Sequence, residues 1–432
     1  MHHGPSSTSN SPRLLRSSTV VALGLGVAGV GTLVMLAAGA RIYSPDTYAV
    51  FATWWTTATL LGLTFGAMEV YLARQTIAAT AREGNPGPVV GYLTGITLAA
   101  VVATWLILAL AQGWLADRLF GGSRSAVGLL GLFVLLTAAQ ALFRGVATAR
   151  QQFPAIGLQL SSDGALRAVL AVAGAWLSPE QVELSLMGVC TAAGLSIVVG
   201  GRLCPAWYRR PRLRGGGISL GPLGLLLVSV FGALLVNNAS VPWLAATESV
   251  GPTVIGAFAV ALTLSRMPTQ FLSAAFGPLM ARLATHLDEG TLSEYRRTQR
   301  RSRQLSFTLG ALFVLAFTVL GPLAIRVLLG PHYTLPVWVL TALAAASALM
   351  FVAAVEQAGL VAASRWIAVA APWALAAGAF AATLLAPWEQ LTRAALAPLI
   401  SAAVAVAGLW FALRRTIPVS GAAEVDPPGT WV

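Results

Sequence analysis

The sequence predicts an all-α polytopic membrane protein, with twelve transmembrane helices in two pseudo-symmetric six-helix bundles around a central cavity. Three observations lead to this fold class: a very low charge content, twelve apolar stretches of membrane-spanning length, and an internal repeat. Of 432 residues, 57% are hydrophobic and only 10% are charged, whereas soluble domains carry about 25% charged residues. So few polar groups could not cover the surface of a soluble protein of this size.

Twelve stretches are long enough to cross a bilayer, for which a helix needs about 20 predominantly apolar residues. Nine of them contain no charged residue, and the fifth, sixth and eighth contain one or two. In chain order the predicted spans are 17–40, 47–68, 84–116, 125–143, 153–177, 182–203, 215–247, 252–280, 304–325, 327–355, 366–388 and 394–413.

The arginine distribution predicts the orientation of these spans. The net charge is +12, and all 27 basic residues are arginines. If the N-terminus is cytoplasmic, the inner segments collect 19 arginines, the outer loops hold 4, and the other 4 fall within or at the ends of spans. Such a bias follows the positive-inside rule. We therefore expect a multi-pass protein of the plasma (inner) membrane with both termini in the cytoplasm, and we do not expect nucleic acid as a partner.

The two halves of the sequence resemble each other. Segment 44–52 (SPDTYAVFA) aligns with segment 251–259 (GPTVIGAFA) at an offset of 207, and three further matches follow in the same order at offsets of 208 to 215. An even number of spans in each half makes this a parallel repeat. The expected domains are a cytoplasmic N-terminal tail, a first six-helix bundle, a cytoplasmic linker, a second six-helix bundle and a disordered cytoplasmic tail, over 1–18, 19–204, 205–218, 219–415 and 416–432.

Several short motifs resemble those of bacterial polysaccharide-biosynthesis membrane proteins. They are 40–53 (ARIYSPDTYAVFAT), 143–153 (FRGVATARQQF), 254–261 (VIGAFAVA) and 329–333 (LGPHY). The family that they resemble consists of lipid-linked oligosaccharide flippases in the multidrug/oligosaccharidyl-lipid/polysaccharide exporter superfamily. The resemblance implies alternating access and the transfer of an isoprenoid-diphosphate-linked glycan, a surface polysaccharide precursor, to the outer leaflet. It implies no enzymatic activity.

Two other functions are weighed against this one. The first is an ion-coupled multidrug or small-molecule exporter of the same superfamily, because the motifs above are structural and none identifies a substrate. The second is a membrane-embedded glycan polymerase or ligase. This activity would need a large outer loop with catalytic residues, and no predicted outer loop exceeds about a dozen residues, which is too short for a domain of its own.

Charged residues inside the spans are the candidate functional residues, because a charge in the bilayer is costly and is rarely kept without a use. The first candidate is Arg266, in the middle of the eighth span. A guanidinium can bind the oxygens of a diphosphate in a bidentate manner. We therefore expect Arg266 to bind substrate, with a structural ion pair to Glu69 or Glu356 as the alternative.

Arg167 and Arg144 are two further candidates for substrate binding. Asp163 and Arg167 lie four residues apart in the fifth span, so they share one face of the helix. Either the two neutralise each other, or Arg167 faces the cavity and Asp163 tunes it. Arg144 either faces the cavity or extends along its long side chain to the inner membrane surface.

Three acids, Glu69, Asp163 and Glu356, are expected either to couple transport to Na⁺ or H⁺ or to serve as counter-ions of the cavity arginines. Asn237 and Asn238 in the seventh span offer amides to sugar hydroxyls, with hydrogen bonding between helices as the alternative. The sequence contains no catalytic or metal-binding motif. We therefore expect no catalytic residue, no metal and no cofactor other than a coupling ion.

The repeat adds one observation about these charges. At its offsets, Arg266, Glu69 and Glu356 each correspond to an uncharged residue of the other half, namely Thr59, Gly277 and Leu142. We expect the duplicated scaffold to serve the motion and the unduplicated charges to serve the substrate. Outside the spans, segment 296–303 (RRTQRRSR) holds five arginines. Its expected partners are anionic membrane lipids, with recruitment of a glycosyltransferase or polymerase of the same pathway as the alternative.

Overall fold

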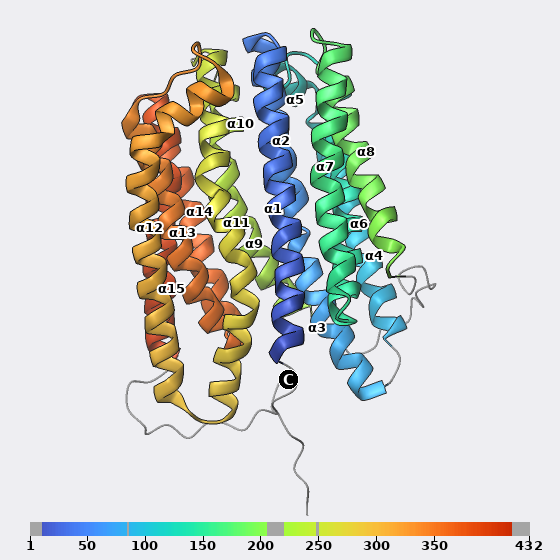
Figure 1. Cartoon of the computed structure of the whole chain (residues 1–432), viewed down its shortest axis with the longest axis vertical. Coiled ribbons are helices and arrows are strands. Elements are labelled where there is room, and N and C mark those ends of the chain that lie inside the picture. The colour runs from blue at the N-terminus through green and yellow to red at the C-terminus, as the bar shows by residue number, and fades with distance from the viewer. Residues whose placement is uncertain (1–10, 84–85, 205–219, 248–249, 417–432) are drawn as a thin grey trace, which may run out of the picture.

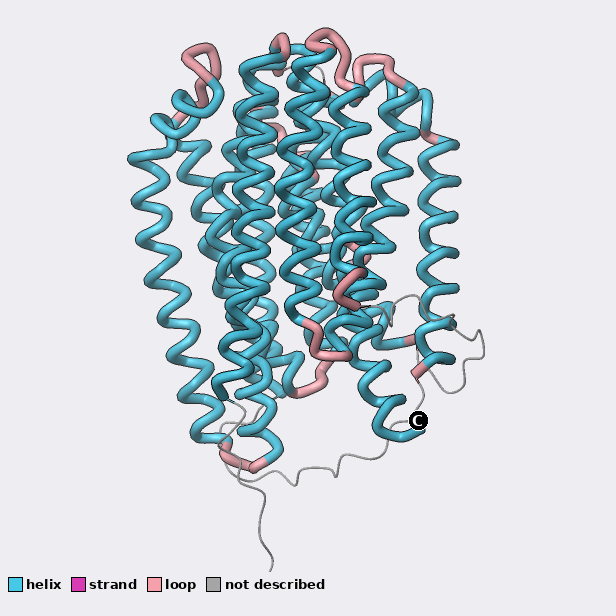
Figure 2. Tube along the Cα trace, turned by 45° about the vertical axis from the view of Figure 1, so that its right-hand side comes forward, coloured by secondary structure: helices cyan, strands magenta, loops and turns pink. Residues whose placement is uncertain are grey.

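The computed structural model describes residues 11–83, 86–204, 220–247 and 250–416, and within these ranges it contains helices and no strand (Figure 1). The helices are α1 (Ser11–Ile42), α2 (Pro45–Leu63), α3 (Gly66–Glu83), α4 (Gly87–Leu110), α5 (Gln112–Leu119), α6 (Arg124–Ala149), α7 (Phe153–Leu177), α8 (Glu183–Gly201), α9 (Gly221–Asn238), α10 (Ser240–Ala246), α11 (Pro252–Asp288), α12 (Leu292–Leu329), α13 (Val337–Ala362), α14 (Trp366–Leu384) and α15 (Gln390–Thr416). They run between two ends at which the loops gather (Figure 2).

These helices make twelve passages through the bundle, which confirms the predicted all-α polytopic fold. Helices α2 and α3 form one passage, since only Thr64 and Phe65 separate them and Thr64 keeps a right-handed helical backbone. Helices α9 and α10 form another, joined by Ala239, which is also helical in backbone angles. Helix α5 adds only a short segment after α4. In the described part of the chain, nine single helices are long and apolar enough to cross a membrane.

The repeat seen in the sequence recurs in the helix ends. Helices α2 and α11 begin at Pro45 and Pro252, 207 residues apart, and each follows an extended capping residue. Proline suits this position, because the first amide of a helix has no partner within the helix. Helices α5 and α12 are each followed by a glycine with positive φ, Gly121 (58°) and Gly330 (104°), 209 residues apart. Both offsets are those of the sequence alignment.

The inner ends of α6 and α13 share an unusual turn. Gln151 and Ser364 are the two described residues other than glycine with positive φ, at 56° and 55°. In each turn this residue donates its amide to the carbonyl three residues back, and the next amide donates to the carbonyl five residues before it. This is the Schellman arrangement that closes a helix. The turns lie 213 residues apart, so here the predicted offset of 214 to 215 was slightly too large.

Helix contacts repeat in the same way. Helix α1 packs on α7 as α9 packs on α14, α3 on α6 as α11 on α13, and α7 on α8 as α14 on α15. The first half (α1–α8) and the second half (α9–α15) therefore share one arrangement and stand beside each other in Figure 1. They meet mainly through α1, α2 and α3 on one side and α9 to α12 on the other.

Contacts at both ends join the two halves. We call the end at which α1 finishes the outer end, following the orientation expected from the arginines. There the Arg41 guanidinium donates to the carbonyls of Val327 and Leu328, and the rings of Tyr48 and Tyr333 meet edge to face at 5.7 Å. At the inner end, the Arg74 guanidinium of α3 lies 4.9 Å from the ring centroid of Trp366 at the start of α14.

Helices α11 and α12 are much longer than a span. They contain 37 and 38 residues, about 55 Å at the usual rise, against a hydrocarbon core of about 30 Å. Their connected ends extend beyond their neighbours at the lower edge of Figure 1. The arginine-rich segment 296–303 belongs to this extension of α12.

Some predicted boundaries differ from the structure. The predicted span 327–355 begins too early, because α12 continues to Leu329 and α13 begins only at Val337. The residues of the loop between the two helices carry no charge, so the sequence did not show where one span ends and the next begins. Helix α1 already begins at Ser11, inside the expected tail 1–18. The expected linker 205–218 and nearly all of the expected tail 416–432 lie outside the described residues.

Candidate functional site

Glycines bring α1 and α7 into close contact around two of the predicted charges. A Cβ atom on Gly24 would lie 2.7 Å from the Gly157 carbonyl oxygen. A Cβ atom on Gly31 or on Gly164 would overlap the backbone of the facing helix. Small residues allow such approach between helices in membranes. Gly164 is next to Asp163, so this contact fixes where the Asp163 and Arg167 side chains lie.

Arg167 and Asp163 form an ion pair on one face of α7, and both are buried. The Arg167 Nη1 also donates to the hydroxyl of Thr32 on α1 at 3.1 Å, and its guanidinium lies 4.7 Å from the ring centroid of Trp55 on α2. Among the contacts of the described residues, its Nε has no hydrogen-bond partner. The geometry matches the arrangement in which the two charges neutralise each other.

The ion pair continues into a chain of polar side chains. Gln140 of α6 donates from Nε2 to Asp163 Oδ1 at 3.2 Å and to Ser196 Oγ at 3.0 Å. Gln159 of α7 donates to the same Ser196 Oγ at 3.1 Å. Its Oε1 accepts from Arg144 Nη1 at 3.4 Å. Hydrogen bonds therefore link α6, α7 and α8 inside the first half.

Glu69 ends this chain. Its Oε2 lies 2.7 Å from Arg144 Nε, which joins α3 to α6. We call the connected set the first-half polar chain: Glu69, Arg144, Gln159, Ser196, Gln140, Asp163, Arg167 and Thr32. It contains two arginines and two acids, so its formal charges balance. Sequence reasoning missed Gln140, Gln159 and Ser196, although polar side chains in apolar spans are a signal for hydrogen bonding between helices.

Arg266 of α11 has a different environment in the second half. Its Nη1 donates to Asn238 Oδ1 at 2.7 Å, at the end of α9. Its Nη2 is buried and, as far as the described chain shows, has no hydrogen-bond partner. No ion pair joins Arg266 to a described acid. The two acids considered as its alternatives pair with other arginines, Glu69 with Arg144 and Glu356 with Arg303. The structure thus brings together two predicted residues that lie 28 positions apart.

The two asparagines use their amide nitrogens within their own helix. Asn237 donates to the carbonyl of Ala233 at 2.8 Å, and Asn238 donates to that of Leu234 at 3.0 Å. The bond from Asn238 fixes its side chain so that the amide oxygen faces Arg266. Asn238 therefore positions the guanidinium, whereas the amide of Asn237 is used to bond its own helix.

Glu356 of α13 forms a third cluster at the inner part of the second half. It is fully buried, and its Oε1 lies 3.3 Å from Arg303 Nη1 of α12. Its Oε2 accepts from Gln299 Nε2 at 3.2 Å. A Cβ atom on Gly359 would lie 2.7 Å from the Tyr295 hydroxyl oxygen, so glycine makes room for this cluster. Sequence reasoning treated Arg303 only as one of five neighbouring arginines that set topology and contact anionic lipid or a pathway enzyme, and did not predict its pairing with Glu356.

These three groups have no geometry of a metal site. Within the described ranges, no three residues among histidine, cysteine, aspartate and glutamate come together as candidate metal ligands. The acids instead accept hydrogen bonds from arginine and glutamine. Among the described residues, Arg266 thus combines a buried donor without a hydrogen-bond partner with the absence of an ion pair. The other two clusters have internally paired charges.

Comparisons with other proteins agree with the fold. No family model matches the sequence. Two uncharacterized proteins of Mycobacterium tuberculosis, from strains CDC 1551 and H37Rv, are each 28% identical over 410 residues, which is 91% of this chain and 90% of theirs. The sequence relatives therefore extend over almost the whole chain.

Solved structures of transporters also align along nearly its full length. The Vibrio cholerae MATE transporter VcmN in the bent form gives a TM-score of 0.61 at 14% identity, over 95% of this chain and 97% of that one. A MATE protein in complex with MaD3S gives 0.63 at 13% identity over 94% and 95%. The inward-facing form of a multidrug resistance MATE transporter of the MOP superfamily gives 0.62 at 13% over 92% and 98%. The chain is thus a polytopic membrane protein with the fold of MATE transporters of the MOP superfamily.

Proposed function

We propose that this protein is a flippase that moves an isoprenoid-diphosphate-linked oligosaccharide across the plasma membrane by alternating access. The fold supports membrane transport, since its solved neighbours are transporters. The observation that carries the finer proposal is Arg266, which has a buried Nη2 without a partner and no ion pair to an acid of the described chain.

An anionic substrate would satisfy Arg266. Burying a charge without a counter-ion is costly, and a diphosphate oxygen would supply both the charge and the missing acceptor. Charge-assisted hydrogen bonds of this kind are among the strongest in proteins. Asn238 supports the binding of an anion by Arg266. Its Oδ1 accepts a hydrogen bond from Arg266 Nη1 at 2.7 Å, which holds one edge of the guanidinium and leaves the other edge for the substrate.

The same charge argues against a cationic drug as the substrate. Two like charges about 8 Å apart repel by about 2 kcal/mol at an effective dielectric constant of 20. A multidrug exporter of the same fold is the second candidate, and a neutral or anionic drug would be compatible with Arg266. The two candidates differ in whether the substrate carries a diphosphate and a lipid tail.

The paired clusters have a supporting role in this proposal. Glu69 and Asp163 act as counter-ions of Arg144 and Arg167, so that the first half carries no unpaired charge near the substrate path. Coupling to Na⁺ or H⁺ would then require an ion to compete with an arginine for one of these carboxylates. Both chain termini face the cytoplasm, in line with the arginine bias.

Complementation of a strain that lacks the gene tests the function. We expect lipid-linked glycan to accumulate on the cytoplasmic face in this strain, and the wild-type protein to restore surface polysaccharide. Arg266→Gln should fail to restore it, and Arg266→Lys should restore it partly, because lysine keeps the charge but not the bidentate geometry. Arg326→Gln, which removes an exposed arginine near the outer end of α12, is the matched control and should behave as wild type.

Two results would overturn the proposal. The first is full restoration by Arg266→Gln at a normal protein level. The second is a deletion strain with normal surface polysaccharide and increased drug sensitivity, which would favour the exporter.

A further inference from the structure

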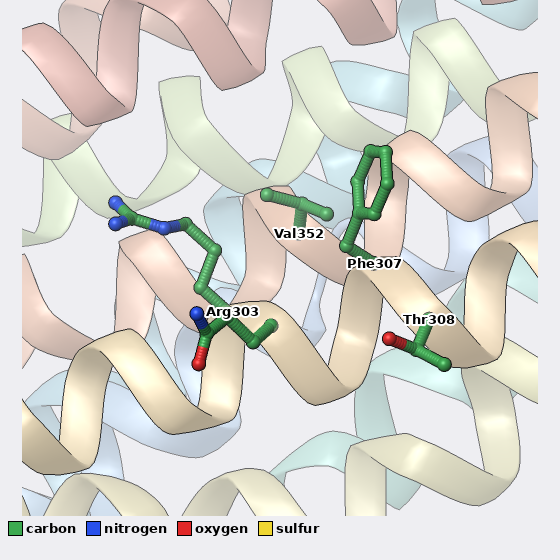
Figure 3. A pocket seen from close by; sticks show the side chains of 5 residues that line it. Arg303, Phe307, Thr308 and Val352 are labelled. Atoms are coloured by element: carbon green, nitrogen blue, oxygen red, sulfur yellow. The ribbon is translucent and has the colours of Figure 1, made fainter.

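A groove on the surface of the second half lies apart from Arg266 and from the first-half polar chain. It has a volume of about 440 Å³ and is lined by Arg303, Gln304, Phe307 and Thr308 of α12 and by Val352 of α13. Figure 3 shows these side chains in the groove. The lining combines the polar side chains of Arg303, Gln304 and Thr308 with the apolar side chains of Phe307 and Val352, which suits an amphipathic ligand.

The groove lies where α12 changes from basic to apolar. Residues 292–303 contain five arginines and one glutamate, whereas residues 304–325 contain no charge. From the level of the groove onward, α12 exposes Leu305 (60%), Leu312 (59%) and Leu315 (65%) on its surface. Such apolar exposure on a membrane-spanning helix places these side chains against acyl chains. The groove therefore lies at the boundary between lipid headgroups and hydrocarbon.

Arg303 is held in place by a buried partner. Glu356, which is fully buried, lies 3.3 Å from its Nη1, and a guanidinium has further N–H donors. The Arg303 side chain stays 35% exposed. It can thus bind Glu356 with one edge and an anionic oxygen in the groove with the other.

Arg300 supplies charge that Glu356 does not neutralise. It is exposed and lies four residues before Gln304, on the same face of α12 and one turn nearer the inner end. A phosphodiester above Gln304 and Thr308 would meet the field of Arg300 as well as the free edge of Arg303. Each basic residue near a membrane surface contributes about 1 kcal/mol to the attraction of anionic lipid.

We propose that this groove is a binding site for an anionic phospholipid of the inner leaflet, with its phosphodiester at Arg303 and Arg300 and an acyl chain along Phe307 and Val352. A free phosphate would make no use of the apolar lining, Phe307 and Val352. A zwitterionic phospholipid would bring its own cation close to the arginines. The occupant is therefore a lipid with net negative charge, such as phosphatidylglycerol.

Native mass spectrometry of the purified full-length protein tests this site. The protein is equilibrated with mixed phosphatidylcholine and phosphatidylglycerol of the same acyl chains, and the bound lipids are counted. We expect retention of phosphatidylglycerol over phosphatidylcholine, and about a fivefold loss of that retention in Arg300→Gln. Arg282→Gln is the matched control, since it removes one exposed arginine near the inner end of α11.

A second variant tests Arg303 without leaving the buried Glu356 unpaired. Arg303→Gln combined with Glu356→Gln leaves the net charge unchanged and removes both partners of the buried pair. If the groove binds the lipid, this double variant should also lose phosphatidylglycerol. If net charge alone attracts the lipid, the retention of phosphatidylglycerol should stay unchanged.

Three outcomes would overturn the proposal. They are equal retention of the two lipids, equal losses in Arg300→Gln and Arg282→Gln, and displacement of the lipid by inorganic phosphate. The last outcome would show that the groove binds the free anion.

Discussion

Four arginines with side-chain partners on the helices fall into two kinds that differ in their counter-ions. Arg144, Arg167 and Arg303 each have a carboxylate within ion-pair distance. Arg266 bonds to an amide oxygen instead. A buried ion pair contributes little net stability, although the loss of one partner is costly because the other charge remains buried. The paired arginines should therefore respond to mutation through folding, and Arg266 through substrate binding.

The Asp163–Arg167 pair allows a direct test of this distinction. Asp163→Asn leaves Arg167 buried without its counter-ion and should lower the free energy of unfolding by about 3 to 5 kcal/mol. The double variant Asp163→Asn/Arg167→Gln removes both charges and should be the more stable of the two. Thermal unfolding of the purified protein in detergent measures both. A double variant that is less stable than Asp163→Asn would contradict the assignment.

Sequence reasoning at the residue scale found the charges, but among their partners it anticipated only the pairing of Asp163 with Arg167. Arg266, Asp163 and Glu356 stand out in apolar spans because each is costly there. Asp163 pairs with Arg167 on its own helix, but the partners of Arg266 and Glu356 lie on other helices, 28 and 53 positions away. Arg144 and Glu69 are separated by 75 positions. Uncharged polar residues such as Gln159 give no comparable signal, since they pack in many membrane helices without a special role.

At the scale of helices, the close contact between α1 and α7 depends on facing glycines. Its counterpart in the second half uses Gly232 of α9, where an added Cβ would lie 2.9 Å from the carbonyl oxygen of Trp373 on α14. Because lipid tails are as apolar as the helices, association in a membrane depends on such close packing. The long apolar runs predicted the helices, whereas the glycine contacts depend on which faces meet in the folded bundle.

Gly31→Ala should disturb this contact. The added methyl group would overlap the carbonyl of Gly164, and overpacking of this kind costs about 1 to 3 kcal/mol. Gly95→Ala on α4 is the matched control, because a Cβ atom there has open space around it. We expect a lower unfolding temperature for Gly31→Ala and no loss for Gly95→Ala. Equal unfolding temperatures of the two variants would mean that α1 and α7 tolerate separation.

At the scale of the whole molecule, two similarly built halves touch at both ends and carry different charges. The repeat explains why the spans could be predicted as a set, since both halves reuse the same caps and turns. It also explains why the charged groups could not be inferred by symmetry: the first half has a balanced polar chain and the second half has Arg266. Alternating access requires the end contacts of such halves to open in turn.

A reversible crosslink at the outer end tests this motion. In a background without Cys190 and Cys204, the pair Tyr48→Cys and Tyr333→Cys places one thiol in each half at rings that lie 5.7 Å apart. A short thiol-specific crosslinker should stop transport, and its reductive cleavage should restore transport. The control pair, Tyr43→Cys and Ser185→Cys, lies within the first half. Transport that continues with the outer ends crosslinked would rule out opening at this contact.

The central claim, that Arg266 recognises an anionic substrate, is tested most directly by equilibrium binding to the purified protein. A short-chain isoprenoid diphosphate is compared with the isoprenoid alcohol, for the wild type, Arg266→Gln and Arg326→Gln. We predict that the wild type and Arg326→Gln prefer the diphosphate, and that Arg266→Gln binds it at least about tenfold more weakly, as the loss of a charged hydrogen bond requires. Equal affinity of the wild type for diphosphate and alcohol, or unchanged diphosphate binding by Arg266→Gln, would contradict the claim.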